Sequence, residues 1–264
     1  MDILYSQQIK TKNLCRQKKL YWHIKKNVKK SLEAAMLLYK ENPTEGNKEN
    51  LLFVQDANDL NDACEHVDKL SQYLASIGEE NRIVPLIDSL PVAVTDQPFA
   101  IKIRQKFATP RKWGRDEICY FANFGGPFLE KWDAKSLEKG IGGSETAVIE
   151  LAKEWTKLGW KVTIYGDPQV KGKDEFGITW LPYYFFNSRD YFNVYIQWRG
   201  WQTAGNIKCR KFFVDLHDIV SDQGLSDEQS RNIDKVFFKS KAHRALLKKL
   251  PQEKVKVVGN GVKI

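Results

Sequence analysis

The residues with the clearest chemical potential in this sequence are the glycines of Gly140-Ile141-Gly142-Gly143-Ser144-Glu145-Thr146-Ala147, which precede an amphipathic helix pattern. Glycines at a helix start let a bulky anionic ligand approach the backbone. The first-turn N–H groups have no partners inside the helix, and the helix dipole favours negative charge there. The pattern therefore indicates a phosphate or diphosphate site at Gly142, Gly143, Ser144 and Glu145. A second interpretation stays open, in which these glycines only form a tight turn.

The same segment departs from the fingerprint of dinucleotide-binding proteins. That fingerprint needs a third glycine three residues after the second, and this sequence has Glu145 there. The loop before Gly143 is about twenty residues long, far longer than an ordinary strand-to-helix connection. It contains Gly125-Gly126-Pro127 and several aromatic residues. A loop of this length after a first strand is more typical of a binding loop than of a simple connection.

Two further polar groups follow predicted strands, at Asp215-Leu216-His217-Asp218 and at Gln197-Trp198-Arg199-Gly200. Residues at the carboxyl ends of parallel strands line the ligand crevice of an open α/β sheet. His217 and Asp218 either face a substrate or form a capping turn. Arg199 either binds an anionic or sugar acceptor or is an ordinary solvated arginine. No metal is expected, because the sequence has no convincing Asp-x-Asp and its other histidines have no partners at ligand spacing.

These residues must be positioned by a sheet that begins after Pro110, where apolar runs of strand length alternate with helical patterns. Such alternation predicts an α/β fold with a Rossmann-like parallel sheet. One helix is predicted from Gly143 to Leu158, with Leu151 and Leu158 on its inner face, and a second over Lys241–Leu250, stopped by Pro251. The predicted strands are Glu117–Ala122, Lys161–Tyr165, Phe192–Gln197, Lys211–Leu216, Lys235–Phe238 and Lys254–Val258.

A helical extension is predicted to precede this sheet. Apolar residues recur at helical spacing over residues 1–40, 58–77 and 96–107, and the composition of residues 41–47 predicts a turn. Two short apolar runs, 51–55 and 83–90, are ambiguous between strand and helix. We therefore expect a helical, basic extension over residues 1–112 and a Rossmann-like domain over residues 113–264.

Residues 140–165 resemble the opening of retaining GT-B glycosyltransferases, and the members of glycosyltransferase family 4 are the most similar type. The family typically carries Gly-Gly-x-Glu and then a Leu-Ala…Leu…Gly-His-x-Val-Thr-Val passage, in which Trp160 here replaces the usual His. Residues 235–244 are similar to the family's strand-Ser-helix element. Residues 255–262 are similar to its Val-x-Val-Ile-Pro-Asn-Gly-Val passage, with Gly259 in place of Pro. The resemblance covers about residues 115–264 and none of residues 1–110.

The resemblance implies transfer of a sugar from a nucleotide-sugar donor to an acceptor, with retention of configuration and without a metal or other cofactor. It implies that the Gly142–Gly143 loop faces the leaving diphosphate. It also implies that His217 lies near the transferred sugar as the catalytic residue. In the family, the Asn260-Gly261-Val262 passage leads into a second Rossmann domain that holds most of the donor. Residues 1–264 alone are therefore expected to be inactive.

The net charge of +9 is concentrated at the start of the chain. Residues 1–30 hold nine Lys or Arg and one Asp, a net of +8, which leaves +1 for the remaining residues. The leader either packs as a solvated helix face, lies on an anionic membrane surface or binds nucleic acid. The first interpretation is favoured and nucleic acid is disfavoured, because a nucleic-acid-binding domain usually carries its charge on a folded face. We expect a cytoplasmic protein with peripheral membrane contact through residues 1–30 as an alternative.

Two rival functions remain. Asp167 follows the second predicted strand, where the ribose-binding acid of a nicotinamide-dependent enzyme sits. The long first loop and the missing third glycine argue against that function. A non-catalytic binding or adaptor module is the other rival, because half of the expected active site lies outside residues 1–264. The identities of the sugar, the nucleotide and the acceptor have no signal in the sequence.

Overall fold

The computed structural model describes residues 28–122, 131–218 and 224–259. Its internal contacts divide the chain into two units, residues 1–107 and residues 108–264. The division precedes the expected boundary at 112/113, because Asp190 holds the connecting segment to the second unit. The buried Asp190 carboxylate accepts hydrogen bonds from the Arg111 N–H and from Trp113 Nε1, both at 3.0 Å. The predictions made for residues 1–27, including most of the basic leader, lie outside the described residues.

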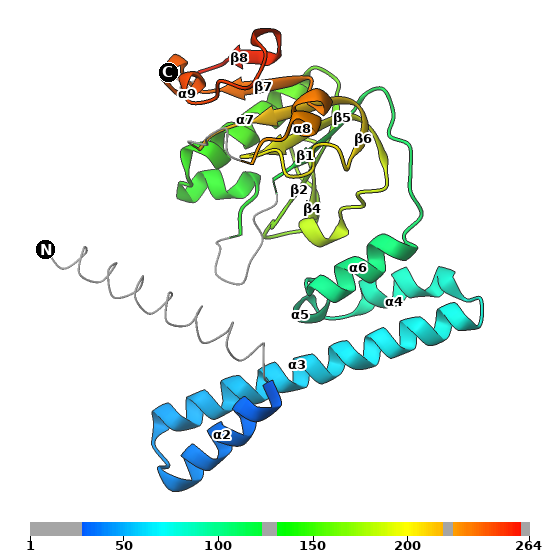
Figure 1. Cartoon of the computed structure of the whole chain (residues 1–264), viewed down its shortest axis with the longest axis vertical. Helices are drawn as coiled ribbons and strands as arrows, with labels where there is room; N and C mark the ends of the chain where they lie inside the picture. The colour runs from blue at the N-terminus through cyan, green and yellow to red at the C-terminus, as the bar shows by residue number, and fades with distance from the viewer. Residues whose placement is uncertain (1–27, 123–130, 219–223, 260–264) are drawn as a thin grey trace, which may run out of the picture. The chain divides into compact units, whose positions relative to one another are not determined.

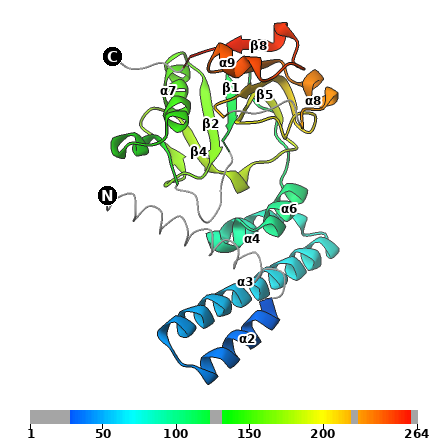
Figure 2. The ribbon, with the colours of Figure 1, turned by 60° about the vertical axis from the view of Figure 1, so that its left-hand side comes forward.

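The first unit is helical in its described part. Figures 1 and 2 both show α2 alongside α3 and α4 alongside α6. The small core consists of Leu74, Ile83, Ile87 and Ala100. None of the helices described in either unit combines the length and apolar character needed to cross a membrane. The elements are α2 (Val28–Glu41), α3 (Glu45–Ser76), η1 (Glu80–Arg82), α4 (Ile83–Ser89), α5 (Val92–Thr95) and α6 (Pro98–Phe107).

Helix α3 is longer than the predicted helix over residues 58–77. The Thr44 side chain accepts a hydrogen bond from the Asn47 N–H and so begins the helix at Glu45. The predicted turn over residues 41–47 is therefore only a short break at residues 42–44. Gly78, with a φ of 77°, follows the last turn of the helix and ends it. The two ambiguous segments, 51–55 and 83–90, lie in α3 and α4.

The second unit is an α/β domain built on an eight-stranded, mostly parallel sheet, which confirms the predicted α/β class and is compatible with a Rossmann-like fold. The strand order is β3-β4-β2-β1-β5-β6-β7-β8, and only β3 is antiparallel to its neighbour. The elements are β1 (Glu117–Phe121), η2 (Ala134–Lys139), α7 (Gly143–Lys157), β2 (Lys161–Gly166), β3 (Gly172–Lys173), β4 (Thr179–Pro182), η3 (Tyr183–Phe185), β5 (Tyr191–Trp198), β6 (Lys208–Asp215), α8 (Asp227–Asn232), β7 (Lys235–Phe238), α9 (Lys241–Ala245), η4 (Gln252–Lys254) and β8 (Val255–Val257).

The strand order reverses at β1. The chain first builds outward from β1 through β2 and then continues on the other side of β1 with β5, β6 and β7. In open α/β sheets, ligands bind outside the carboxyl ends of the strands at such a reversal. The carboxyl ends of β1 and β5 are therefore the place where this rule would put a ligand site.

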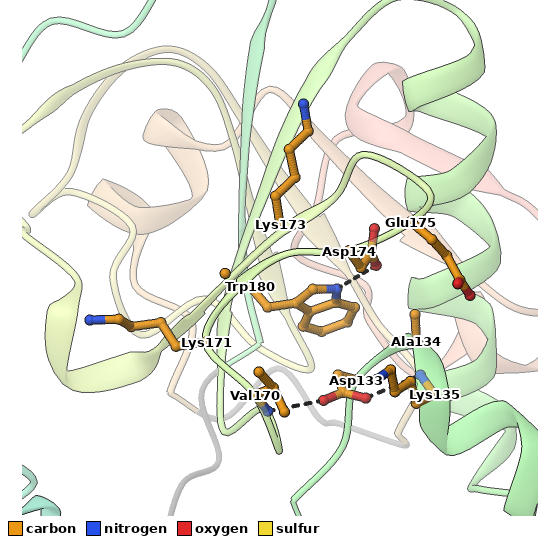
Figure 3. Close-up of a pocket in the computed structure, with 10 residues that line it drawn as sticks. Asp133, Ala134, Lys135, Val170, Lys171, Lys173, Asp174, Glu175 and Trp180 are labelled. Atoms are coloured by element: carbon orange, nitrogen blue, oxygen red, sulfur yellow. Dashed lines mark hydrogen bonds between the residues drawn. The ribbon is translucent and has the colours of Figure 1, made fainter.

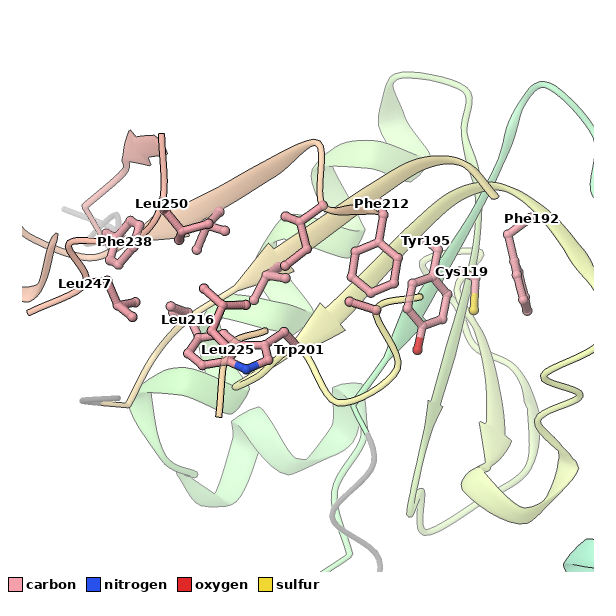
Figure 4. Close-up of a cluster of buried hydrophobic side chains, with 14 of the residues drawn as sticks. Cys119, Phe192, Tyr195, Trp201, Phe212, Leu216, Leu225, Phe238, Leu247 and Leu250 are labelled. Atoms are coloured by element: carbon pink, nitrogen blue, oxygen red, sulfur yellow. The ribbon is translucent and has the colours of Figure 1, made fainter. Parts of the chain in front are cut away.

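Successive side chains along each strand point to opposite faces of the sheet, so the sheet separates two hydrophobic cores. Ile118 and Tyr120 of β1 pack with Val148, Ile149 and other residues on the face covered by α7. The intervening Cys119 belongs to the opposite face, where Figure 4 shows it in a row with Tyr195 and Phe212. Cys119 is fully buried.

Several predicted details of the second unit are wrong. On α7, Leu151 and Leu158 are exposed, and Ile149 is buried in their place. Helix α9 ends at Ala245, because Arg244 donates from Nη1 and Nη2 to the Leu247 and Leu250 carbonyls and so supports a non-helical turn. Strands β3 and β4 were not predicted.

Removing the Trp113 side chain tests whether residues 108–116 belong to the second unit. The indole is 4% exposed and its ring lies 5.0 Å from that of Phe192. We expect Trp113→Ala to lower the free energy of unfolding by about 3–5 kcal/mol, as large core truncations do. Arg115→Ala, at an exposed position of the same segment, is the control. Urea unfolding followed by fluorescence measures both, and equal stability of the two variants would contradict this assignment.

Candidate functional site

Helix α7 begins at Gly143, and its two leading glycines are not explained by backbone conformation. Gly142 is the N-cap with φ −57° and ψ 148°, which any residue can adopt, and Gly143 is helical. The left-handed conformation occurs at Gly140, with a φ of 75°. The tight-turn interpretation therefore applies to Gly140, and the reason for glycine at positions 142 and 143 must lie in their surroundings.

The two glycines differ in what surrounds them. A Cβ on Gly142 would collide with the Glu145 carboxylate, so this glycine makes room for a side chain of its own helix. A Cβ on Gly143 would meet no atom of the described residues within 4 Å. Position 143 thus offers the exposed first turn of α7, where backbone N–H groups and the helix dipole favour an anion.

Arg199 connects this helix start to the carboxyl end of β5. Its Nη2 donates to Ser144 Oγ at 2.5 Å and lies 3.3 Å from Glu145 Oε1. Its Nε lies 3.1 Å from Asp218 Oδ2, and the guanidinium stacks 3.9 Å from the Trp198 ring centroid. Predicted residues from three segments of the chain are therefore brought into direct contact.

The backbone at Arg199 is also unusual. Its φ of 61° is the one left-handed value at a non-glycine residue in the described ranges. This conformation is sparsely populated for side chains with a Cβ and persists where the surrounding contacts enforce it. The Arg199 N–H donates to the Asp215 carbonyl at 2.9 Å, which fixes the turn after β5 against the end of β6.

The Asp215 carboxylate is the buried centre of the site. Oδ2 accepts hydrogen bonds from Tyr120 Oη at 2.7 Å and from His217 Nε2 at 3.1 Å, and Oδ1 accepts from Lys239 Nζ at 2.6 Å. Burial alone would raise the pKa of Asp215, but the hydrogen bonds and charges of His217 and Lys239 outweigh it and hold the pKa at about 2. Burial, with the adjacent Asp215, raises the pKa of Tyr120 well above its ordinary value.

His217 lies at the predicted edge of the sheet, but its side chain is only 3% exposed. The imidazole packs edge-on against Trp198, with 6.2 Å between ring centroids. Asp218 is the more accessible of the two neighbours, at 57% exposure. Arg199 and Asp218 are thus the more exposed residues of this cluster, and His217 is the buried one.

Four residues of this cluster were not predicted as site residues: Tyr120, Trp198, Asp215 and Lys239. Lys239 directly follows β7, so the rule that singled out Arg199 and Asp218 also applies to it. Tyr120 has no such signal, because it lies inside a strand and meets Asp215 across 95 residues of sequence.

A separate cavity of about 260 Å³ lies beside β3 and β4, and none of the predicted site residues lines it. Figure 3 shows two of its acidic side chains, Asp133 and Asp174, hydrogen-bonded to the protein itself. The Asp133 carboxylate accepts from the Lys135 and Val170 N–H groups, and Asp174 accepts from Trp180 Nε1. These two carboxylates therefore hold loops together. In the described part of the chain, no three His, Cys, Asp or Glu side chains gather as a metal site.

Comparison with known proteins assigns the chain to no family. No family model matches the sequence, no curated protein matches it, and no solved structure matches the fold. The side chains at the strand ends, together with the fold, are therefore the observations from which a function must be inferred.

The Asp215 pKa predicts a specific dependence of stability on pH. Because this pKa is lowered in the folded state, Asp215 stabilises the fold above its ordinary value of 3.8, and the stabilisation is lost as the pH falls toward about 2. The contribution is about 2 kcal/mol. An asparagine at position 215 does not titrate, so Asp215→Asn lacks this pH-dependent stabilisation. The difference in unfolding free energy between the natural chain and Asp215→Asn should therefore shrink by that amount as the pH falls over this range. Urea unfolding at each pH measures the difference, and a constant difference would contradict the assignment.

Proposed function

We propose that residues 108–264 form one wall of the active site of a retaining GT-B glycosyltransferase. The reaction transfers a sugar from a nucleotide-sugar donor to an acceptor, and the proposed mechanism uses no metal. One observation carries the proposal beyond the sequence resemblance. Arg199 joins the N-terminus of α7 to the ends of β5 and β6, at the place where the strand order reverses.

In this proposal the leaving diphosphate lies on the first turn of α7. Position 143 is open, and the backbone N–H groups there are fixed by the helix before the ligand arrives. The carboxylate of Glu145 would repel a phosphate, but Arg199 is paired with it. The helix start therefore supplies preorganised dipoles where negative charge develops on the leaving group.

His217 is proposed to bind a hydroxyl of the transferred sugar. Its Nε2 is engaged with Asp215, so Nδ1 is the nitrogen that this role requires. Because the side chain is only 3% exposed, this role requires the surroundings of His217 to open when the sugar binds. Asp215 and Lys239 hold the imidazole in place and do not contact the sugar in this proposal.

Gly143→Val tests the phosphate position. A valine side chain would project into the space where the diphosphate is proposed to lie, and its Cβ would meet no described atom within 4 Å. We expect binding of UDP to residues 1–264 to weaken by at least about tenfold, close to the upper range for a helix-terminus interaction. Isothermal titration calorimetry measures the affinity.

Gly46→Val is the matched control for this substitution. Gly46 lies in the first turn of α3 and also has open space around its Cβ position. Its substitution should leave UDP binding unchanged, and circular dichroism should show both variants folded. Unchanged UDP affinity in folded Gly143→Val would remove the phosphate assignment.

Residues 1–264 alone are expected to show no repeated turnover of a nucleotide-sugar. The first turn of α7 contributes about 0.3–2 kcal/mol of charge stabilisation. Enzymes typically lower the barrier by at least about 8 kcal/mol, so one wall cannot supply the whole effect. A radiolabelled transfer and hydrolysis assay with several nucleotide-sugars measures this. Multiple turnovers that disappear in Gly143→Val would show that this wall is sufficient by itself.

A further inference from the structure

We propose that β2, β3 and β4, on the face of the sheet opposite α7, bind a small aromatic molecule that carries one anionic group. The inference goes beyond the proposed function and is independent of it. It rests on a cavity of about 620 Å³, a size typical of small-molecule sites. The cavity is lined by residues at the start of β2 and β4, whereas the diphosphate position proposed at Gly143 follows the carboxyl end of β1.

Successive side chains along β2 and β4 point to opposite faces of the sheet. Val162, Ile164 and Trp180 belong to the core that α7 covers. Thr163 and Thr179 lie next to them in sequence, so their side chains point to the other face. Parallel strands are usually covered on both faces, but on this face both threonines line the cavity. The sheet therefore has space here for a bound molecule.

Two hydroxyl groups and one ammonium group lie in a row across these three strands. Thr163 pairs with Thr179 in the register of β2 and β4, and Thr179 pairs with Lys173 in that of β4 and β3. The side-chain oxygen and nitrogen atoms of these three residues have no hydrogen bond or ion pair with any residue that the structure describes. Figure 3 shows the Lys173 side chain extending away from Asp174 and Glu175. All three groups can therefore donate hydrogen bonds to a ligand.

Among the described residues that line the cavity, Lys173 is the cation without an acidic partner. Lys161 Nζ lies 2.8 Å from Asp116, and Arg111 Nη1 lies 3.3 Å from Glu117, so these charges compensate each other. An ammonium beside two hydroxyls matches the oxygens of a carboxylate or of a phosphate ester. The ligand is thus expected to bring one anionic group to Lys173.

Aromatic and aliphatic side chains supply the apolar part of the cavity. Tyr165 is 6% exposed, Phe176 is 39% exposed, and Trp160 and Leu181 are half-buried. Rings of this kind pack well against another aromatic ring. The cavity is also far larger than an inorganic phosphate or sulfate ion needs. An anion with an aromatic body uses both the polar row and the apolar wall, and it is therefore the class of ligand that fits.

The test uses pairs of probes that share an aromatic body and differ in the anionic group. Naphthalene-2-carboxylate is compared with naphthalene-2-carboxamide, and 2-naphthyl phosphate with 2-naphthol. Ligand-observed NMR on residues 1–264 at low salt gives the affinity of each probe. We expect at least one of the anions to bind more tightly than its neutral counterpart. The pair with the larger preference identifies whether the anionic group is a carboxylate or a phosphate ester.

Lys173→Met removes the unpaired charge and keeps a side chain of similar length. The preference for the anion should fall by about three- to fivefold, the range expected for one exposed ion pair. Lys135→Met is the matched control, because Lys135 is also an exposed lysine but lines the neighbouring cavity of Figure 3 instead of this one. Its substitution should leave the preference unchanged.

A second variant combines Thr163→Val with Thr179→Val, which removes both hydroxyls and keeps the shape of the side chains. It should lower the preference for the anion by about twofold or more, the effect of lost hydrogen bonds, while circular dichroism shows a folded chain. Gly143→Val should leave the preference unchanged, because position 143 does not line this cavity. Equal binding of anion and neutral probe in both pairs, an unchanged preference in Lys173→Met, a preference lost in Gly143→Val, or no binding of any probe at millimolar concentration would overturn the inference.

Discussion

The buried carboxylate of Asp215 is the group on which the arrangement of the strand ends around Arg199 depends. It gathers a hydroxyl from β1, an imidazole from the segment after β6 and an ammonium from the residue after β7. Its backbone carbonyl also holds the Arg199 N–H after β5. A buried charge without these partners would be strongly unfavourable, so the carboxyl ends of four strands are fixed by one group.

This constraint explains why an unusual backbone at Arg199 can persist. The left-handed turn directs the chain away from β5 while the guanidinium reaches back to Ser144 and Glu145. The guanidinium also stacks on the Trp198 ring and pairs with the Asp218 carboxylate. The helix start and the strand ends are thus set relative to each other before any ligand binds, which is the kind of preorganisation that electrostatic catalysis needs.

The sequence predicted the strands and helices that depend on a local pattern of residues. The strands around β1 and β5, helix α7 and its end at Gly159 all follow from periodicity and from glycine and proline positions. It did not predict β4, whose four residues carry too short a pattern. It also did not predict the partners of Asp215, because Tyr120 is 95 residues away and only the pairing of strands brings them together. The order of strands in the sheet determines the site, and no single segment encodes that order.

The contacts of Asp167 help to distinguish the glycosyltransferase interpretation from the nicotinamide interpretation. In a dinucleotide enzyme, an acid after the second strand must reach the ribose. Here Asp167 follows β2, but its carboxylate is 19% exposed and lies 3.8 Å from Lys131, and its carbonyl accepts the Trp132 N–H. Burial raises its pKa against the opposing effect of Lys131. The segment that leads from β1 to α7 thus contacts the position where a ribose would bind. The long connection between β1 and α7 takes the place of the short turn found in dinucleotide-binding folds, and it also contacts Asp167, the candidate ribose-binding acid. The first turn of α7 at Gly143, in contrast, stays open.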